Sequence, residues 1–309
     1  MTMMNTTSSI DKYPSKPTLR ECISFALPAL GIYICPSLMS LIDASFIGSK
    51  SNSVMELAAL GPASSISDCA PSLLLFLSIA STNLIAKAAN TMDNNNSSSS
   101  TSRRITQTSL ALGTTVGILL SIVLYRFSLP LSRLYCSSTQ MAVPCSQYVS
   151  IRALALPFVI IANIAQAVCI GTKDTRTPMI SVVLAGVTNL IGDFLLVPRT
   201  GIVGAAWATS FSQMIAAVLL LQVLYRRNLL YSRRQKKDTT ISATNIDDVA
   251  PTFVTILHQL VSFVPFLFVM CVKIGWHNAC SATAASLGGI PAAAHTALLS
   301  IAGICFTFG

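Results

Sequence analysis

Residues 22–42 read CISFALPALGIYICPSLMSLI and contain no Asp, Glu, Lys or Arg. Such a run matches the roughly 20 residues that an α-helix needs to cross the hydrocarbon of a bilayer. Four further uncharged runs have the same character, at residues 105–125, 153–172, 200–225 and 249–272. The sequence therefore predicts a chain that crosses the membrane several times.

Three more spans are expected, each with one irregularity. Residues 57–86 carry Asp68, residues 177–198 carry Asp193, and residues 274–309 carry two histidines. The total is seven helices and an eighth that runs to the last residue. Alternating segments of about ten residues, which a membrane barrel requires, are absent from the sequence. The predicted fold class is all-α, a polytopic transmembrane helix bundle.

The composition agrees with a surface that faces lipid. The sequence is 52% hydrophobic and 10% charged, against about 25% charged in a typical soluble domain. Its net charge of +9 comes from basic residues between the apolar runs and not from an amphipathic face, which argues against a nucleic-acid partner. The lipid bilayer is the expected partner.

The distribution of Lys and Arg predicts the orientation. With alternate loops assigned to opposite sides, fourteen fall on the side of the N-terminus and six, including Arg152 and Lys273, on the other. The positive-inside rule then places the N-terminus in the cytoplasm. Plasma membrane, vacuole and plastid envelope all remain open.

The loops divide the chain into four parts. We expect a polar tail at residues 1–20, a six-helix N-lobe at 21–225, a basic cytoplasmic linker at 226–248, and the first two helices of an incomplete C-lobe at 249–309. A polar insert at 91–102 is expected to be a solvated loop. AALGPASSI at 58–66 matches AAHTALLSI at 293–301 in four places, as a duplicated bundle would.

Carboxylates inside membrane helices are costly, so acids within the spans are candidates for function. Asp43 and Asp193 both fall in the outward half of outward-running spans, and two acids at one depth could share a cavity and exchange a proton there. Asn189 lies one helical turn before Asp193, on the same face. The alternative is that each acid ends its helix at the interface, and Asp68 fits an interfacial or capping role equally well.

Other features point to no enzymatic chemistry. His258, His277 and His295 lack the spacing of a metal site, and no nucleophile elbow, phosphate loop or zinc motif is present. We therefore expect neither an enzyme nor a bound cofactor or metal. Pro28 and Pro36 remove backbone hydrogen bonds from the first helix and provide positions where it could bend.

Two longer stretches resemble a known family. LPALGIYICPSLMSLIDASFIGSKSNSVMELAALGPASSISD at 27–68, followed by FLSIASTNLIAKA at 76–88, resembles the first two helices of the multidrug and toxic compound extrusion (MATE) family, in its DinF-like and plant plastid-type branch. GTKDTRTPMISVVLAGVTNLIGDFLLVPRTGIVGAAWATSFSQ at 171–213 resembles that family from its fourth helix into its sixth. The resemblance is good over residues 19–223 and loose beyond them.

This resemblance implies a cation-coupled antiporter, driven by H⁺ or Na⁺, that exports small organic solutes by alternating access between two six-helix lobes. It assigns cation coupling to Asp43, Asn189 and Asp193, helix bending to Pro28, and further cavity positions to Asn163 and Thr209. The family has twelve helices, so the chain is expected to be truncated after the eighth. Another polypeptide could then supply the missing C-lobe.

Two alternatives within the membrane class stay open. A lipid-linked oligosaccharide flippase of the same superfamily would be expected to carry cationic residues within its spans, and none of the Lys or Arg is expected there. A non-transporting truncated membrane protein would follow from the missing lobe. A seven-helix receptor would need an extracellular N-terminus, opposite to the orientation that the basic residues predict.

Overall fold

The computed structural model describes residues 18–50, 54–91, 95–136, 138–230, 258, 261–262 and 264–306. Most of the expected polar tail, the basic linker beyond residue 230 and most of the first half of the expected seventh span lie outside these residues. Every regular element within the described ranges is an α-helix. The helices are α1 (Leu19–Lys50), α2 (Val54–Leu73), α3 (Leu75–Thr91), α4 (Asn95–Tyr135), α5 (Thr139–Gly171), α6 (Arg176–Thr200), α7 (Ile202–Arg226), α9 (Val264–Ser286) and α10 (Gly289–Phe306).

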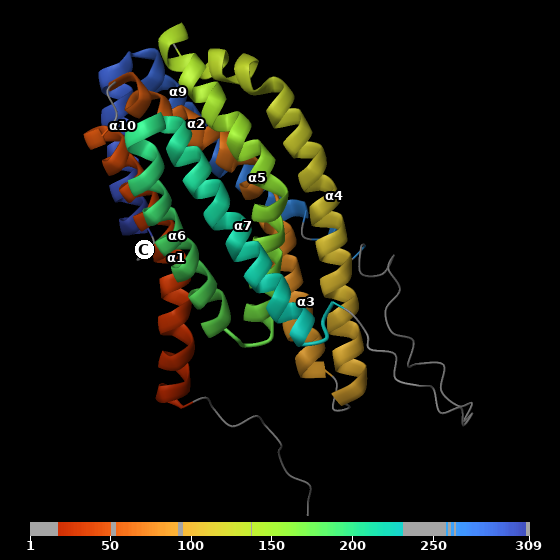
Figure 1. Cartoon of the computed structure of the whole chain (residues 1–309). Helices are drawn as coiled ribbons and strands as arrows, with labels where there is room; N and C mark the ends of the chain where they lie inside the picture. Colours follow the sequence, from red (N-terminus) through yellow and green to blue (C-terminus); the bar gives the residue numbers. More distant parts are fainter. Residues whose placement is uncertain are drawn as a thin grey trace, which may run out of the picture.

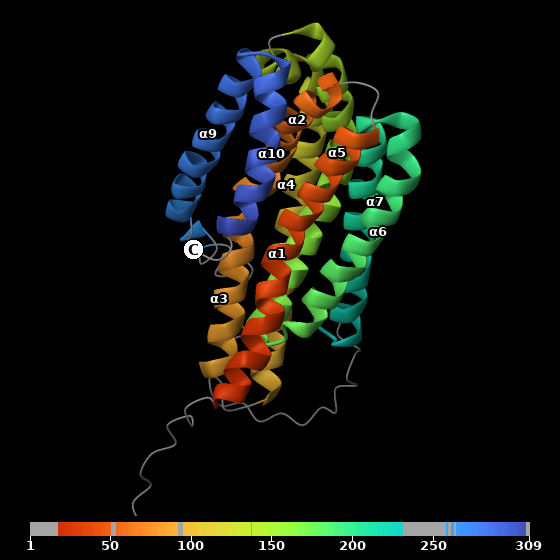
Figure 2. The same cartoon turned by 90° about the vertical axis from the view of Figure 1, so that its left-hand side faces the viewer.

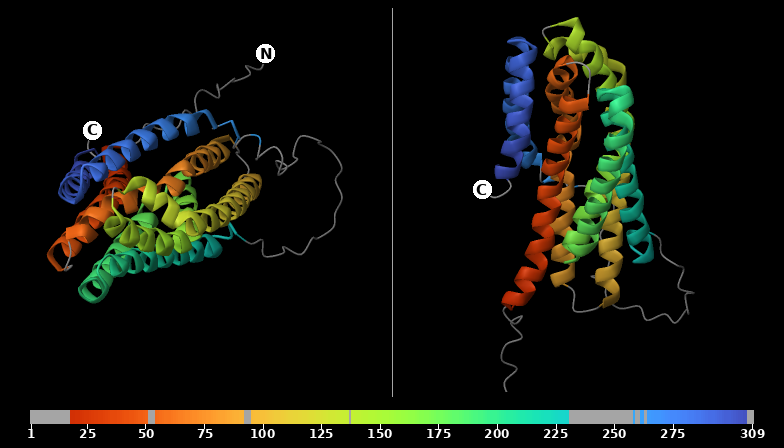
Figure 3. Two further views of the ribbon diagram at one scale, coloured as in Figure 1. Left: turned by 90° about the horizontal axis from the view of Figure 1, so that it is seen from above. Right: turned by 60° about the vertical axis from the view of Figure 1, so that its left-hand side comes forward.

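The all-α bundle predicted from the sequence is confirmed. Six segments of the described chain are long and apolar enough to cross a membrane, with α2 and α3 forming one of them. They run up and down side by side (Figures 1 and 2), and α4 with α5 and α6 with α7 form closely packed antiparallel pairs. Seen from above, α9 and α10 lie along the side of the bundle away from α6 and α7 (Figure 3).

The boundaries expected for the last two spans are wrong. A break was predicted at Lys273, between 249–272 and 274–309, but α9 runs through Lys273 and ends at Ser286. The chain turns instead at Gly288, whose φ of +120° is a backbone conformation that side-chain-bearing residues rarely adopt. A single Lys in an otherwise apolar stretch is compatible with a membrane helix because its long stem lets the ammonium reach polar surroundings.

Two other local expectations need correction. The polar insert at 91–102 is not a loop throughout, because residues 95–102 form the first turns of α4. The span at 57–86 is not continuous, because the helix is interrupted at Leu74, three residues after Pro71. Proline lacks the backbone N–H that a helix interior uses, which weakens the last turn of α2.

Asp174 fixes the turn between α5 and α6. One oxygen of its carboxylate accepts hydrogen bonds from the backbone N–H groups of Arg176 at 3.1 Å and Thr177 at 3.2 Å, and Arg227, just after α7, forms an ion pair with the other. Partial burial opposes the charge of Asp174, but the bonds from Thr177 and the contact with Arg227 outweigh it and lower the pKa of Asp174. This contact holds the start of α6 against the end of α7.

The two copies of the expected repeat pack against each other. Residues 58–66 lie in α2 and residues 293–301 in α10, and these helices are in contact. Gly61 and Thr296, the fourth residues of the two copies, meet at the crossing: a Cβ on Gly61 would lie 2.2 Å from Thr296 Oγ1 and 3.4 Å from its Cβ. Contact between equivalent positions is what a two-fold relation between two repeats produces.

This crossing yields a stability prediction. Gly61→Ala should lower the free energy of unfolding by about 1–3 kcal/mol, because the added methyl overlaps the Thr296 hydroxyl. Gly61→Ala combined with Thr296→Ala should recover most of the loss, since only an ordinary Cβ contact remains. Thermal unfolding in detergent measures both. A double variant as unstable as Gly61→Ala alone would contradict the close approach.

Candidate functional site

Asn189 joins two buried acids that come from different helices. Its side-chain amide donates one hydrogen bond to Asp43 Oδ1 at 2.6 Å and another to Asp193 Oδ2 at 3.2 Å. Asp43 is on α1, whereas Asn189 and Asp193 are one turn apart on α6. The structure therefore brings together the three residues that the sequence singled out.

The three helices reach the site at a common depth. Asp43 lies seven residues before the end of α1 at Lys50, and Asp193 lies seven residues before the end of α6 at Thr200. Thr209 lies seven residues after the start of α7 at Ile202. Seven residues of helix correspond to about 10 Å. The acids are thus well inside their helices, and the helix-terminal alternative does not hold.

Burial makes this site chemically unusual. Asp43 is 6% exposed, and Asn189 and Asp193 are 0% exposed. Two ionised carboxylates that bind the same buried amide repel each other and are poorly solvated, so they favour sharing a proton or binding a cation. Asp193 Oδ1 and Asn189 Oδ1 are buried without a hydrogen-bond partner among the described residues, and both are acceptors available to a proton or cation.

Thr209 completes the site from α7. Its hydroxyl lies 3.3 Å from Asp43 Oδ2 and 2.8 Å from the backbone oxygen of Ala205. A hydroxyl has one hydrogen, so it can donate to only one of these oxygens at full strength. If Asp43 is protonated, its O–H can donate to Thr209 while Thr209 donates to Ala205. This arrangement suits the protonated form of Asp43. Thr209 thus lies beside the acid pair, and the cavity role that the resemblance implies for it stays a prediction.

A glycine allows α7 to come this close to α6. A Cβ on Gly192, the residue before Asp193, would lie 2.7 Å from Ala208 Cβ and 3.1 Å from Ala208 Cα. Small residues at such crossings let two membrane helices approach backbone to backbone. Gly192 and Ala208 therefore bring Asp193 and Thr209 within reach of the same carboxylate of Asp43.

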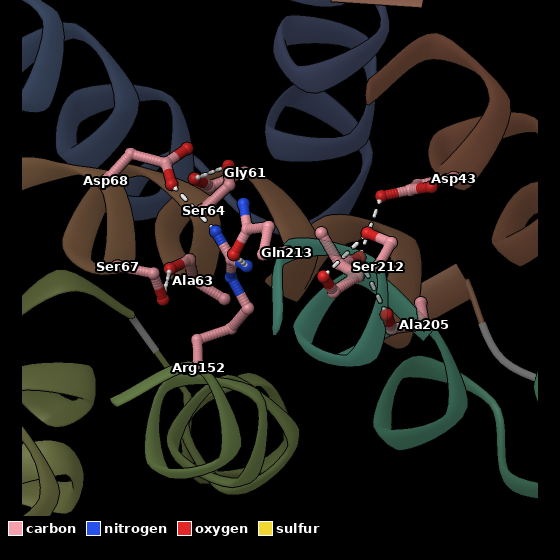
Figure 4. A network of polar contacts seen from close by, with 11 residues as sticks. Asp43, Gly61, Ala63, Ser64, Ser67, Asp68, Arg152, Ala205, Ser212 and Gln213 are labelled. Atoms are coloured by element: carbon pink, nitrogen blue, oxygen red, sulfur yellow. Dashed lines mark hydrogen bonds and ion pairs between the residues drawn. The ribbon is translucent and has the colours of Figure 1, made fainter. Parts of the chain in front are cut away.

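A second polar cluster lies one helical turn further along α7, and the sequence reasoning missed it. Arg152 on α5 donates hydrogen bonds to Gln213 of α7 and, at 3.2 Å, to Asp68 of α2 (Figure 4). The sequence predicts that Arg152 lies in a loop on the side opposite the N-terminus, but Arg152 lies thirteen residues inside α5 and is 8% exposed. Asp68 is not a helix cap but the acidic partner of Arg152.

The remaining candidates do not join the acid site. Asn163 is half-buried on α5 and forms no hydrogen bond with the acid site in the described part of the chain. Pro28 lies fifteen residues before Asp43 on α1, which stays helical through it. Among the described residues no group of His, Cys, Asp or Glu has the arrangement of a metal site.

The part of the chain that matches a family model includes the residues of this site. The MatE family model matches residues 28–195, more than half of the chain, and the match includes Asp43, Asn189 and Asp193. The chain belongs to the MatE family. Members of this family are multi-pass membrane transporters and not enzymes.

Individual relatives agree with the assignment to MatE. The chain is 29% identical over 267 residues to Protein DETOXIFICATION 47, chloroplastic, of Arabidopsis thaliana, covering 84% of this chain and 47% of the relative. It is 32% identical over 225 residues to Protein DETOXIFICATION 44, chloroplastic, of the same plant, covering 70% and 43%. The chain thus spans about half the length of the curated relatives it matches.

A solved structure shares the fold. The inward-facing conformation of a multidrug resistance MATE family transporter of the MOP superfamily superimposes with a TM-score of 0.69 at 17% identity, over 91% of this chain and 64% of the other. At this identity the likeness concerns the MatE fold alone.

Two glycines of α6 provide a matched test of the site's packing. Gly192→Ala should cost about 1–3 kcal/mol of unfolding free energy, because the methyl meets the backbone of α7. Gly186→Ala, on the same helix, should be neutral or slightly stabilising, since its Cβ would lie 3.6 Å from Met39 Sδ, an ordinary contact. Thermal unfolding in detergent compares them. Equal stability of the two variants would show that α6 and α7 are further apart.

Proposed function

We propose that the chain is the N-lobe, with two helices of the C-lobe, of a proton-coupled antiporter that exports small organic solutes by alternating access. The observation that carries the proposal is the contact of Asn189 with both Asp43 and Asp193 in a buried site inside the bundle. MatE membership supports the transport of small molecules across a membrane. The coupling ion and the antiport direction rest on the chemistry of the site.

The orientation of the amide favours a proton over Na⁺. Asn189 presents its two N–H groups to the acids, and a positively polarised amino group between two carboxylates disfavours a metal cation in the same space. A proton shared by the carboxyls is compatible with these bonds. Na⁺ is the second candidate, and it would need the Asn189 amide turned so that its oxygen faced the acids.

Proton binding gives a physical route to a conformational change. Once Asp43 and Asp193 are neutral, they no longer require hydration or a cation, and α1, α6 and α7 can close around them. Once ionised, the pair favours a state in which water reaches it. The helices that carry the pair would thus prefer different arrangements in the two protonation states.

The buried Arg152 bears on the flippase alternative. A cationic residue inside a span was the feature expected of a lipid-linked oligosaccharide flippase, and the structure contains one. Arg152 is nevertheless paired with Asp68, so this cluster offers no net positive charge to a phosphorylated headgroup. The antiporter remains the better supported function.

The membrane is proposed from the relatives and the loops. Three relatives bear the word chloroplastic in their names, which supports a plastid membrane over the plasma membrane or vacuole. The excess of Lys and Arg on the side of the N-terminus supports a cytoplasmic or, in a plastid, stromal N-terminus. The location of a fluorescent fusion protein tests which membrane holds the chain. Protease access to the two ends of the chain tests the orientation of the N-terminus.

Gradient-driven transport tests the proposed function. Sealed vesicles containing the full chain, with an imposed proton gradient, should accumulate ethidium, a fluorescent organic cation, and should stop when a protonophore is added. Asp43→Asn and Asp193→Asn should each reduce this accumulation by at least tenfold, because neither variant can hold the shared proton. Asp174→Asn, in the turn before α6, should retain it.

Two outcomes would count against the proposal. Accumulation that is unchanged in both Asp43→Asn and Asp193→Asn would reject their coupling role. Accumulation driven by a sodium gradient and not by a proton gradient would show that the coupling ion is Na⁺ and not a proton. No accumulation by wild-type vesicles under either gradient would contradict transport by these 309 residues alone, which the proposal does not require.

A further inference from the structure

Arg152 is a permanent charge in the interior of the bundle. A guanidinium stays protonated at any physiological pH, so a buried Arg must be compensated by nearby groups. Its partners among the described residues are Gln213, which is neutral, and Asp68, whose side chain is 59% exposed. Arg152 Nε is buried without a partner. The charge of Arg152 is thus compensated by one acid that is itself accessible from outside the protein core.

The exposure of Asp68 is informative because of its position. Asp68 lies fourteen residues after the start of α2, about 20 Å from that end of the helix. A carboxylate at this depth is costly against lipid and is tolerated where water or a cavity reaches it. The open cavity of about 550 Å³ between α2, α4 and α9 is lined on α2 by Cys69 and Leu73 and not by Asp68. The Asp68 carboxylate is instead exposed on the surface of the described bundle, where its charge needs water or a cation beside it.

The Arg152 cluster is adjacent to the acid pair. On α7, Thr209 contacts Asp43. One helical turn further along α7, Gln213 contacts Arg152 (Figure 4). Charges separated by roughly one turn still interact appreciably inside a protein.

The other charged and titratable groups around the acid pair complete its electrostatic environment. Tyr148, one turn before Arg152 on α5, is buried within range of Arg152, Asp43, Asp68 and Asp193. Glu56 of α2 accepts a hydrogen bond from the backbone N–H of Ile202, at the end of the bundle. His295 Nε2 of α10 lies 3.4 Å from Ser281 Oγ of α9. Arg152 is thus the cation found close to the pair in the described chain.

We propose that Asp68 and Arg152 form a charge relay from the exposed side of α2 to the acid pair, in which an organic cation that neutralises Asp68 drives the proton off Asp43 and Asp193. When no cation is bound to Asp68, its carboxylate offsets the positive charge of Arg152. When a cation occupies Asp68, the charge of Arg152 is uncompensated and stabilises the ionised acids. The relay rests on the proposed proton coupling. It would account for antiport, because the binding of solute and the binding of a proton oppose each other.

Dicyclohexylcarbodiimide labelling tests the relay without a transport assay. This reagent modifies protonated carboxyls in apolar surroundings, and mass spectrometry of the peptides that contain Asp43 and Asp193 follows labelling across a pH series. Arg152→Gln should move the midpoint of labelling up by about one pH unit, because a nearby positive charge is lost. Asp68→Asn should move it down. Arg152→Lys should stay near the wild-type midpoint.

Two comparisons separate electrostatics from a folding defect. Arg152→Gln combined with Asp68→Asn should return the midpoint towards that of the wild type, because the two charges cancel. Tetraphenylphosphonium, an organic cation, should lower the midpoint in the wild type and leave Asp68→Asn unaffected. Triphenylphosphine oxide, a neutral molecule with similar aromatic groups, should have no effect on either protein.

The outcomes distinguish the relay from the proton coupling on which it rests. If wild-type Asp43 and Asp193 are not labelled at any pH, the proposed proton site fails. If they are labelled, but Arg152→Gln and Asp68→Asn shift the midpoint in the same direction or not at all, the relay alone is overturned. A tetraphenylphosphonium effect of equal size in Asp68→Asn would also overturn it.

Discussion

The arrangement of the N-lobe around its site depends on one amide that lies between two buried carboxylates. Asn189 donates to Asp43 and to Asp193, so it holds α1 and α6 together where two negative charges would otherwise separate them. The acids have no direct cationic partner among the described residues. Because burial of two ionised carboxylates is costly, we propose that a proton or another cation is shared between them. This requirement links the packing of the helices to the occupancy of the site.

Close contacts between helices support the site formed by Asn189 and the two acids, and α7 adds further polar contacts to it. Gly192 against Ala208 brings α6 and α7 near enough for Thr209 to reach Asp43. One turn away, Gln213 binds Arg152, whose acidic partner Asp68 is accessible. The same face of α7 thus contacts a buried acid pair and a buried cation. In the proposed relay, a solute at Asp68 and a proton at Asp43 would be coupled through these fixed charges.

The acid site could be predicted from the sequence, whereas the Arg152 cluster could not. Asp43 and Asp193 interrupt long apolar runs, and the spacing from Asn189 to Asp193 fixes a common helix face. Arg152, by contrast, directly precedes an uncharged run, so it looked like the loop residue before a span. In the structure α5 begins at Thr139, and only contacts from α2 and α7 show that Arg152 is buried. The position of the turn before α10 could not be predicted from the sequence either. A single glycine such as Gly288 indicates a turn less clearly than a charged residue such as Lys273 between two apolar runs.

The sharing of one proton by Asp43 and Asp193 is the central claim, and infrared difference spectroscopy tests it most directly. The carbonyl stretch of a protonated carboxylic acid reports its hydrogen bonding, and isotope-labelled aspartate assigns the band to these residues. We expect one band for the pair in the wild type, shifted in frequency and in pH dependence by either Asp43→Asn or Asp193→Asn. A band of Asp193 that is unchanged in Asp43→Asn would show that the two acids titrate independently and would contradict the shared site.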